Sequence, residues 1–247
     1  MAESEITSFD QEQFEAIYPQ GVERHYWNRC RIAVITDNLR SIKDAGPMLE
    51  VGCGKGLVVS ALRRNGFDIT GVELAEVEPL KEVAPFVHVN TDALDLDPGI
   101  RSGIQTILLL DVIEHLEDPV AFMTRLRSAF PKLRRFVVTV PARQELFSNY
   151  DRFNRHFRRY DMPLLRHHAE SSMGKVRSAG YFYHALYPAA WIQLRTHGAR
   201  KLNFTVPAPG VPSFFHRLLG YFFFLEYKVL PSSWRGTSII AVLDLDV

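Results

Sequence analysis

A glycine-rich turn follows a short apolar stretch early in the chain, in Met48-Leu-Glu-Val-Gly-Cys-Gly-Lys-Gly56. The pattern predicts a buried strand that runs into a tight turn, with a helix beginning at about Leu57. Glycines at alternate positions, Gly52, Gly54 and Gly56, let the backbone approach a ligand because no Cβ stands in the way. The stretch therefore restricts the chain to folds in which a strand, a tight turn and a helix succeed one another.

Two common phosphate-binding turns do not match this stretch. A dinucleotide-binding fingerprint needs its third glycine one residue later, where Leu57 stands. A P-loop needs Ser or Thr after Gly-Lys, whereas Gly56 follows Lys55 here. The pattern therefore argues against both of these nucleotide sites.

Apolar stretches later in the chain alternate with segments of helical periodicity, and this alternation predicts an α/β fold. The expected strands are 48–52, 68–73, 87–91, 106–111, 134–140, 181–187 and 238–244. The expected helices are 22–41, 56–65, 76–84, 119–129 and 163–179. Strand–helix alternation implies a mainly parallel sheet with right-handed crossovers.

Acidic residues stand where three of these strands end. Glu73 ends the second strand, Asp92 follows the third and Asp111 ends the fourth. An open α/β sheet binds ligands at the carboxyl ends of its strands. An acid at the position of Glu73 can accept hydrogen bonds from both ribose hydroxyls of an adenosine group. Enzymes that use NAD also have an acid at this place, so Glu73 indicates adenosine without specifying the reaction.

Taken together, these motifs resemble those of the class I methyltransferases that depend on S-adenosylmethionine (SAM), most closely the branch with quinone-biosynthesis and bacterial small-molecule enzymes. The matching stretches are Glu50–Gly56, Gly71–Glu73, Asp92–Ala93 and Asp111–Pro119. The resemblance implies a Rossmann-like sheet of seven strands, mainly parallel with the last strand antiparallel, and helices on both faces. It also implies one domain over 1–247, with cap helices in 1–45 and insertions at 142–162 and 191–235 that form an acceptor cap or lid.

The resemblance further implies SAM as cofactor, S-adenosylhomocysteine (SAH) as product, and a donor site built from the turns. Its expected residues are Glu50 as support for the turn, Gly52, Cys53, Gly54 and Gly56 around the methionine part, Glu73 and Leu74 at the ribose, Asp92 and Ala93 at the adenine, and Asp111 and Val112 beside the sulfonium. Cys53 is expected to be a small filler and not a nucleophile.

The segment 144–160 is too long for a simple connector and leaves the sheet at the same edge. Similar enzymes have a comparable Asp-x-x-x-x-His-x-Arg-Arg-Tyr run, which suggests an acceptor cap whose arginines hold an acidic group. The expected substrate-binding residues are Tyr26, Trp27, Arg152, Arg158 and Arg159, and the candidate bases are His115, His156 and Tyr160. The alternatives are a loop fixed by Arg–carboxylate pairs and aromatic rings that only pack on the sheet.

Asp111, Glu114 and His115 are spaced so that they can share one face of a helical turn and hold a divalent metal. Some similar O-methyltransferases use Glu-x-x-Glu-His in this way. No fourth ligand is evident in the sequence, although His156 could fold over the turn. We therefore expect no metal in the site and keep the metal as the less favoured hypothesis.

The apolar segment 213–230 contains His216, Arg217, Glu226 and Lys228, which makes it a poor transmembrane span. It is expected to be a core or dimer helix, a lid over an apolar acceptor, or a helix on a membrane surface. Two cysteines form no disulfide framework, and the acidic start of the chain has no basic apolar leader. The expected location is cytoplasmic.

The expected function is methyl transfer from SAM to a small-molecule acceptor, apolar or acidic, by O-methylation. A net charge of +1 gives no drive towards nucleic acid, and Val138-Thr-Val-Pro141 stands where a nucleic-acid N-methyltransferase would have an Asn-Pro-Pro-Tyr motif. Two alternatives stay open, a SAM-binding regulatory or structural protein without turnover and a nucleotide-dependent oxidoreductase. The chain is expected to be a monomer or a homodimer.

Overall fold

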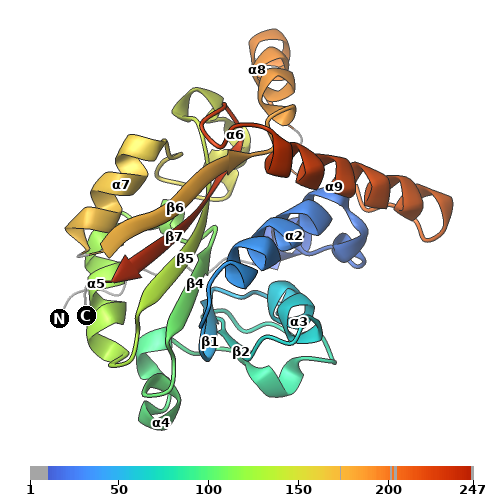
Figure 1. Cartoon of the computed structure of the whole chain (residues 1–247). Coiled ribbons are helices and arrows are strands. Elements are labelled where there is room, and N and C mark those ends of the chain that lie inside the picture. The colour runs from blue at the N-terminus through green and yellow to red at the C-terminus, as the bar shows by residue number, and fades with distance from the viewer. Residues whose placement is uncertain (1–10, 173, 201, 203–204, 246–247) are drawn as a thin grey trace.

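The computed structural model describes residues 11–172, 174–200, 202 and 205–245, and it contains a seven-stranded sheet with helices on both faces (Figure 1). The strands are β1 (Met48–Val51), β2 (Ile69–Val72), β3 (Val87–His88), β4 (Thr106–Leu110), β5 (Arg135–Pro141), β6 (Gly174–Phe182) and β7 (Ser238–Leu245). The α-helices are α1 (Gln11–Ile17), α2 (Tyr26–Arg40), α3 (Leu57–Arg64), α4 (Pro98–Arg101), α5 (Pro119–Ala129), α6 (Asn149–Phe153), α7 (Met162–Ser171), α8 (Leu186–His197) and α9 (Val211–Val229). Short 3-10 turns are η1 (Val22–Arg24), η2 (Ala84–Phe86), η3 (Ala93–Asp95), η4 (Ile113–His115) and η5 (Gln144–Leu146).

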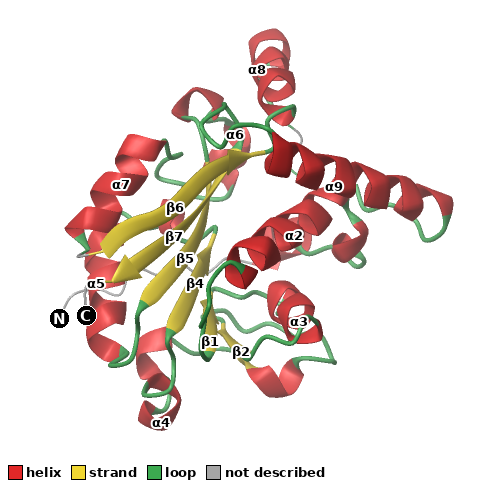
Figure 2. Ribbon diagram, in the orientation of Figure 1, coloured by secondary structure: helices red, strands yellow, loops and turns green. Residues whose placement is uncertain are grey.

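The strand order is β3-β2-β1-β4-β5-β7-β6, and β7 runs antiparallel between β5 and β6 (Figure 2). The expected mainly parallel sheet with a reversed last strand is confirmed. Val51 of β1 is in register with Val72 of β2 and with Leu109 of β4. The carboxyl ends of these three strands therefore lie side by side, which brings the glycine turn, Glu73 and Asp111 to one edge of the sheet.

Alternating side chains of the central strands build a hydrophobic core on each face of the sheet. Leu109 and Val138 face one core, which also contains side chains of α5 and α7. Leu108 and Val137 face the other core, which also contains side chains of α2, α3 and α9. Both faces of β4 and β5 are covered, and this explains why these strands are continuous apolar runs in the sequence.

The helix expected over 76–84 is wrong. Within the segment the structure has turns, and η2 begins only at Ala84. Pro79 has no N–H to donate, and its ring disfavours helical geometry at Glu78. The backbone N–H of Leu80 instead donates to the carbonyl of Lys55 at 2.9 Å, which ties the segment to the glycine turn.

Three boundaries also differ from the expectation. The helix expected over 163–179 ends at Ser171, and β6 begins at Gly174 because β7 pairs along it from Gly174 to Phe182. Tyr183, with φ of +60°, ends this strand, so the strand expected over 181–187 gives way to α8. β3 is limited to Val87–His88.

Each expected cap segment contains helices. α1 and α2 lie in the N-terminal segment 1–45, whose residues 1–10 fall outside the described residues. α6 lies in the first insertion, and α8 with α9 occupies most of the second. α9 packs along α2 on one side of the sheet (Figure 1). The cap and lid roles of these segments stay predictions.

Candidate active site

A cavity of about 380 Å³ lies at the carboxyl edge of the central strands. Its walls come from β1 and the glycine turn, the end of β4, the start of α2, the first insertion and α8. The lining includes Tyr18, Tyr26, Trp27, Arg31, Glu50, Gly52, Cys53, Asp111, Glu114, His115, Tyr150, Asn154, His156, Arg159, Ala189, Gln193 and Arg200. The volume is in the range of small-molecule sites, roughly 300–1,000 Å³.

The glycine turn has the backbone that its sequence predicts. Gly52, Gly54 and Gly56 have φ of +70°, +55° and +79°, and Gly56 caps the start of α3. A Cβ at Gly54 would lie 2.6 Å from the ring of Tyr18, and one at Gly52 would lie 3.2 Å from Cγ2 of Val112. The side chains of Tyr18 and Val112 thus lie close against the backbone of the turn, where only glycine leaves room for them.

The carboxylate of Glu73 supports this turn from the end of β2. It accepts hydrogen bonds from the N–H groups of Gly54, at 2.7 Å, and Ala75, at 3.0 Å. Burial raises its pKa, although these hydrogen bonds oppose the shift. Asp92 caps η3 by accepting from the N–H of Leu94 at 2.8 Å. Seven of the expected donor-site residues do not line the cavity, so their contact with the donor stays a prediction: Gly54, Gly56, Glu73, Leu74, Asp92, Ala93 and Val112.

Asp111 forms an ion pair that the sequence did not indicate. Its Oδ2 lies 2.7 Å from Nη2 of Arg31, and its Oδ1 accepts from the hydroxyl of Thr139 at 3.2 Å. Its φ of +59° turns the chain sharply after β4. Glu50 lines the cavity close to this pair, and burial raises its pKa to about 8 although Arg31 opposes the shift. The donor side therefore contains a buried cation between acidic groups.

Glu114, His115 and His156 lie together on another wall. Each offers a ligand atom, and these atoms are within 4.8 Å of one another. Glu114 is fully buried, and among the described residues neither of its carboxylate oxygens has a hydrogen-bond partner. Two imidazoles and a carboxylate suit a divalent ion, so the chemistry of the cluster fits a metal. Asp111, expected as its first ligand, is instead held by Arg31.

Asp151 fixes the orientation of His156 from inside the first insertion. The carboxylate is fully buried and lies 3.0 Å from Nδ1 of His156 and 2.7 Å from Nε of Arg159. Burial alone would raise the pKa of Asp151, but His156 and Arg159 hold it well below its usual range. Since an ionised carboxylate only accepts, Nδ1 of His156 carries the proton and Nε2 is the basic nitrogen.

The ring of His115 contacts that of His156 edge to face, with centroids 4.6 Å apart. Burial, followed by the neighbouring His156, lowers the pKa of His115 to about 3. A group with such a low pKa is a weak base at neutral pH. Of the candidate histidines, His156 is therefore better arranged to accept a proton.

Several expected site residues lie away from the cavity or are held by other side chains. Tyr160 is fully buried in the core, with its hydroxyl 3.3 Å from both the carbonyl of Ile113 and Nδ1 of His168, so it does not reach the cavity. Arg152 and Arg158 do not line the cavity either, and Arg158 donates to the carbonyl of Glu117 at 2.8 Å. Arg159 lines it, but its guanidinium is committed to Asp151, as in a loop fixed by Arg–carboxylate pairs.

Two further predicted substrate-binding residues, Tyr26 and Trp27, also line the cavity. Sequence reasoning missed Tyr18 and Arg200. The guanidinium of Arg200 lies 5.3 Å from the ring of Tyr150, and burial together with Arg159 lowers its pKa. Arg200 follows α8 in a segment without periodicity, so only the fold indicates that it reaches the cavity.

Comparison with known proteins agrees with this arrangement. A family described as a methyltransferase domain matches residues 24–186. The chain is 28% identical over 143 residues to a ubiquinone biosynthesis O-methyltransferase of Ruegeria sp. (strain TM1040), covering 49% of this chain and 56% of that protein. It is 27% identical to the protein of the same description from Cereibacter sphaeroides (strain ATCC 17025 / ATH 2.4.3), covering 50% and 58%. The chain thus spans little more than half the length of the curated relatives it matches.

Solved structures share the fold at low sequence identity. Magnesium protoporphyrin IX methyltransferase from Synechocystis PCC 6803, with bound SAH, gives a TM-score of 0.57 at 12% identity and covers 95% of this chain and 94% of its own. Burkholderia thailandensis 1,6-didemethyltoxoflavin-N1-methyltransferase, with bound 1,6-didemethyltoxoflavin and SAH, gives 0.56 at 15% identity, with coverage of 95% and 87%. At these identities the likeness concerns the fold alone.

Proposed function

The chain belongs to the methyltransferase-domain family, and from this membership we propose that it transfers a methyl group from SAM to a hydroxyl of a small molecule. One observation carries the proposal. The glycine turn, at Gly52 and Cys53, and a histidine with an oriented basic nitrogen, His156, line the same cavity. A donor and an acceptor bound there would be held next to each other, and proximity is the main contribution that such a displacement needs. Family membership removes the oxidoreductase alternative.

The residues of the donor side fit SAM. Gly52 lines the cavity and has no side chain to fill it, while Glu50 and Asp111 supply acidic groups near the place of the sulfonium. SAM, when bound, supplies an electrophilic methyl group on a positively charged sulfur. The carboxylate of Glu73, which already accepts from the N–H of Gly54, would also accept from the ribose hydroxyls. The ring of Tyr18 lies over Gly54, so the donor would have to share that space with it.

The acceptor side combines aromatic rings with a cation. Tyr26 and Trp27 offer flat apolar surfaces. The guanidinium of Arg31, one helical turn after Trp27, lies 5.3 Å from the centre of the Trp27 ring. Arg200 lines the cavity, and burial of its guanidinium makes an anionic partner favourable. We infer an acceptor that carries a ring or apolar group and an acidic group. Nε2 of His156 would take the proton of the acceptor hydroxyl.

The cluster of Glu114, His115 and His156 supports a second possibility for this step. A divalent ion held there would polarise the acceptor oxygen and lower the pKa of its hydroxyl, so that His156 would act as a ligand and not as the base.

The buried thiols of Cys30 and Cys53 are both unpaired, and we keep a reducing compartment, the cytoplasm, as part of the proposal.

Calorimetric titration with SAM, SAH and NAD tests the donor site. We expect heat with SAM and SAH and none with NAD. Glu73→Ala should abolish the heat, because the turn loses two hydrogen bonds and the ribose loses its acceptor. Glu76→Ala, an exposed acid three residues further on, serves as the matched control and should titrate as the wild type does. Heat with NAD alone would refute the proposal.

Methyl transfer itself is tested by SAH formation with a metabolite extract as the source of acceptors. We expect the wild type to form SAH and His156→Gln to lose this activity while it still binds SAM. His167→Gln, an exposed histidine on α7, is the control. If the wild type binds SAM but forms no SAH with any extract, the chain is the SAM-binding protein without turnover.

A further inference from the structure

The helix α9 has one buried side and one side without a partner in the described structure. Gly220 lets α9 approach α2 closely, since a Cβ there would lie 3.0 Å from Cβ of Arg29. The ring of Phe223 packs against Tyr26, with centroids 5.4 Å apart, and edge to face against Tyr183, with centroids 5.6 Å apart. Glu226 is buried and accepts from the backbone N–H groups at the start of the turn before α8. These contacts hold α9 in a fixed orientation.

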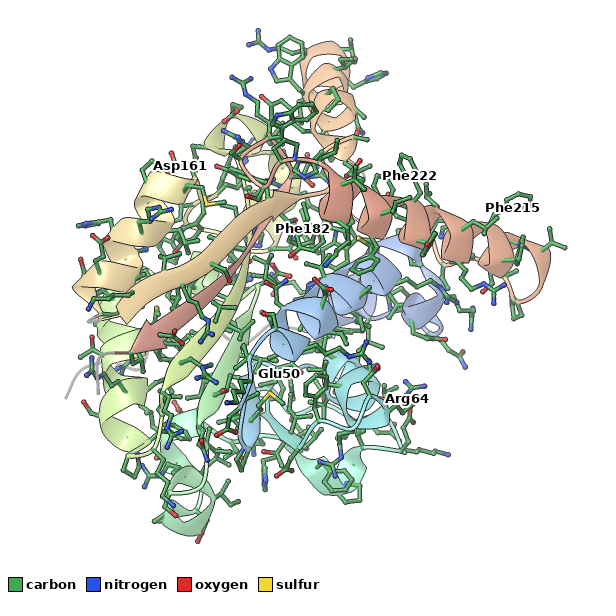
Figure 3. All side chains as sticks on the ribbon, in the orientation of Figure 1. Glu50, Arg64, Asp161, Phe182, Phe215 and Phe222 are labelled. Carbon is green, nitrogen blue, oxygen red and sulfur yellow. The ribbon has the colours of Figure 1, made fainter. Side chains whose placement is uncertain are left out.

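The opposite side of α9 presents a continuous apolar surface to solvent, which we name the outer face. Its side chains are between 39% and 70% exposed, and they are Phe214, Phe215, Leu218, Leu219, Tyr221, Phe222, Leu225 and Val229. Positions three and four residues apart share one side of a helix, so these residues form a stripe along its whole length. Figure 3 shows Phe215 and Phe222 on the side of α9 that faces away from α2. An apolar surface of this extent marks an interaction site.

The segment that carries α8 and α9 is rich in positive charge, although Arg200 lines the cavity and Lys228 pairs with Asp37 of α2 at 3.0 Å. The stretch 186–235 contains six of the 29 Lys and Arg residues but one of the 28 Asp and Glu residues, and that one is the buried Glu226. Arg217 of α9 lies over the ring of Phe214 at 5.1 Å. Burial, and then Arg217, lowers the pKa of Arg29, whereas Glu23 opposes the shift. The guanidinium of Arg29 also donates to the hydroxyl of Ser213 at 3.4 Å, so positive charge lies close to the first turn of α9.

We propose that the outer face of α9 docks on the surface of an anionic lipid bilayer, with its apolar side chains among the acyl chains and its arginines at the lipid phosphates. Aromatic and leucine side chains on one face of a helix, bordered by cations, are the chemistry of an interfacial helix. In the described part of the chain, no helix is long and apolar enough to cross a membrane. The docking goes beyond methyl transfer and does not depend on it.

A second copy of the chain is a less suitable occupant. A symmetric dimer would place the outer face against itself, so that Arg217 would meet Arg217 or other cations of the same stretch. The one acid of 186–235, Glu226, is buried, and Asp37 of α2 already pairs with Lys228 of α9 at 3.0 Å. An anionic lipid surface supplies the missing negative charge, and each cation near it strengthens the binding.

The position of the surface also suits an apolar acceptor. α8, which precedes α9, lines the cavity with Ala189 and Gln193 and exposes Trp191 and Ile192 to solvent. α8 therefore contributes both to the cavity wall and to the exposed apolar surface, so an apolar acceptor could pass from a bilayer to the cavity along it. This consequence rests on the proposed function, whereas the docking itself can be measured without any acceptor.

Co-sedimentation of the full chain with vesicles tests the proposal. We expect binding to vesicles of phosphatidylcholine and phosphatidylglycerol in equal parts and weaker binding to phosphatidylcholine alone. Phe215→Ser combined with Phe222→Ser should lower the partition coefficient by more than about tenfold, because two exposed rings lose their apolar contact. Arg217→Gln should lower it by about fivefold, the equivalent of about 1 kcal/mol per cation.

The matched control is Phe157→Ser, which makes the same change at a similarly exposed ring outside α9 and should bind as the wild type does. Circular dichroism checks that each variant is folded. A wild type that stays in the supernatant with both vesicles overturns the proposal, and so does wild-type binding by the double variant. A wild-type dimer in sedimentation equilibrium that the double variant dissociates would assign the outer face to a contact between copies, which also overturns it.

Discussion

The replacement Asp151→Asn tests whether one buried carboxylate organises the first insertion and orients His156. Asp151 is fully buried, and its carboxylate receives the N–H of Ser148 at 2.8 Å in addition to His156 and Arg159. The side chain of Arg159 is only 4% exposed, so its charge has no access to bulk water. An amide in place of the carboxylate preserves the shape but removes the negative charge and one acceptor oxygen.

The expected loss of stability follows from this geometry. Removal of one partner of a buried ion pair costs about 3–5 kcal/mol, because the other charge stays buried without compensation. The remaining amide oxygen still accepts one hydrogen bond, so we expect a loss of about 3 kcal/mol in the free energy of unfolding. Domains have about 5–15 kcal/mol in total, so the variant should remain folded in water.

Urea unfolding followed by tryptophan fluorescence measures this loss. Asp161→Asn is the control, because Asp161 is an exposed cap of α7 and Asn caps a helix about as well as Asp. Its expected change is below about 0.5 kcal/mol. The double replacement Asp151→Asn with Arg159→Met should recover part of the loss, since no unpaired buried charge remains. If Asp151→Asn is as stable as the control, the reasoning is refuted.

The pH dependence gives an independent check of the sign. The pKa of Asp151 is lowered in the folded protein, so the unfolded chain binds more protons around its own pKa of about 3.9. The stabilisation is therefore present above that value and is lost as the pH falls below it. The difference between wild type and Asp151→Asn should be constant between about pH 5 and 7 and should shrink below about pH 4.

Three further results are expected. Burial raises the pKa of Glu50 to about 8, so between about pH 4.3 and 8 the folded protein keeps a proton that the unfolded chain has released. The free energy of unfolding should therefore fall as the pH rises from about 4.3 and should level off above about 8, and Glu50→Gln should flatten this slope in urea titrations. Arg200→Gln should raise KM for an acidic acceptor about tenfold with little change in kcat, measured by SAH formation, because it removes a charge-assisted contact. Treatment with EDTA should leave methyl transfer unchanged, since Nε2 of His156 can accept the proton; loss of activity that Mg²⁺ restores would instead assign Glu114, His115 and His156 as metal ligands.

The fold was largely predictable, because its signals are local or follow from chain order. The alternation of apolar strands with helices, and the resemblance that the glycine turn at Gly52–Gly56 supports, led to the observed seven-stranded sheet. The errors occurred where a neighbour decided the conformation. Gly174 is itself a signal for the end of a helix, which the expected helix over 163–179 overlooked, and pairing with β7 then makes the residues from Gly174 a strand.

The candidate site was predictable only in part. Side chains close to the turn, such as Glu50 and Asp111, lie at the cavity because parallel strands end at one edge. The partners of those side chains come from distant segments. Arg31 reaches Asp111 from α2, and Arg200 reaches the cavity after α8, and no spacing in the sequence connects them. Tyr160 stands in a motif-like run, yet packing against Ile113 and His168 puts it in the core.

By itself, the sequence determined the features that depend on one residue or on regular spacing. Glycine permits the positive φ angles of Gly52, Gly54 and Gly56, and the apolar stripe of α9 follows from helical periodicity. Only the tertiary structure decided which side of α9 is buried, because the buried Phe223 looks no different in the sequence from the exposed Phe222. Periodicity states which side chains share a face, but the neighbour that a face meets depends on contacts between segments far apart in the chain.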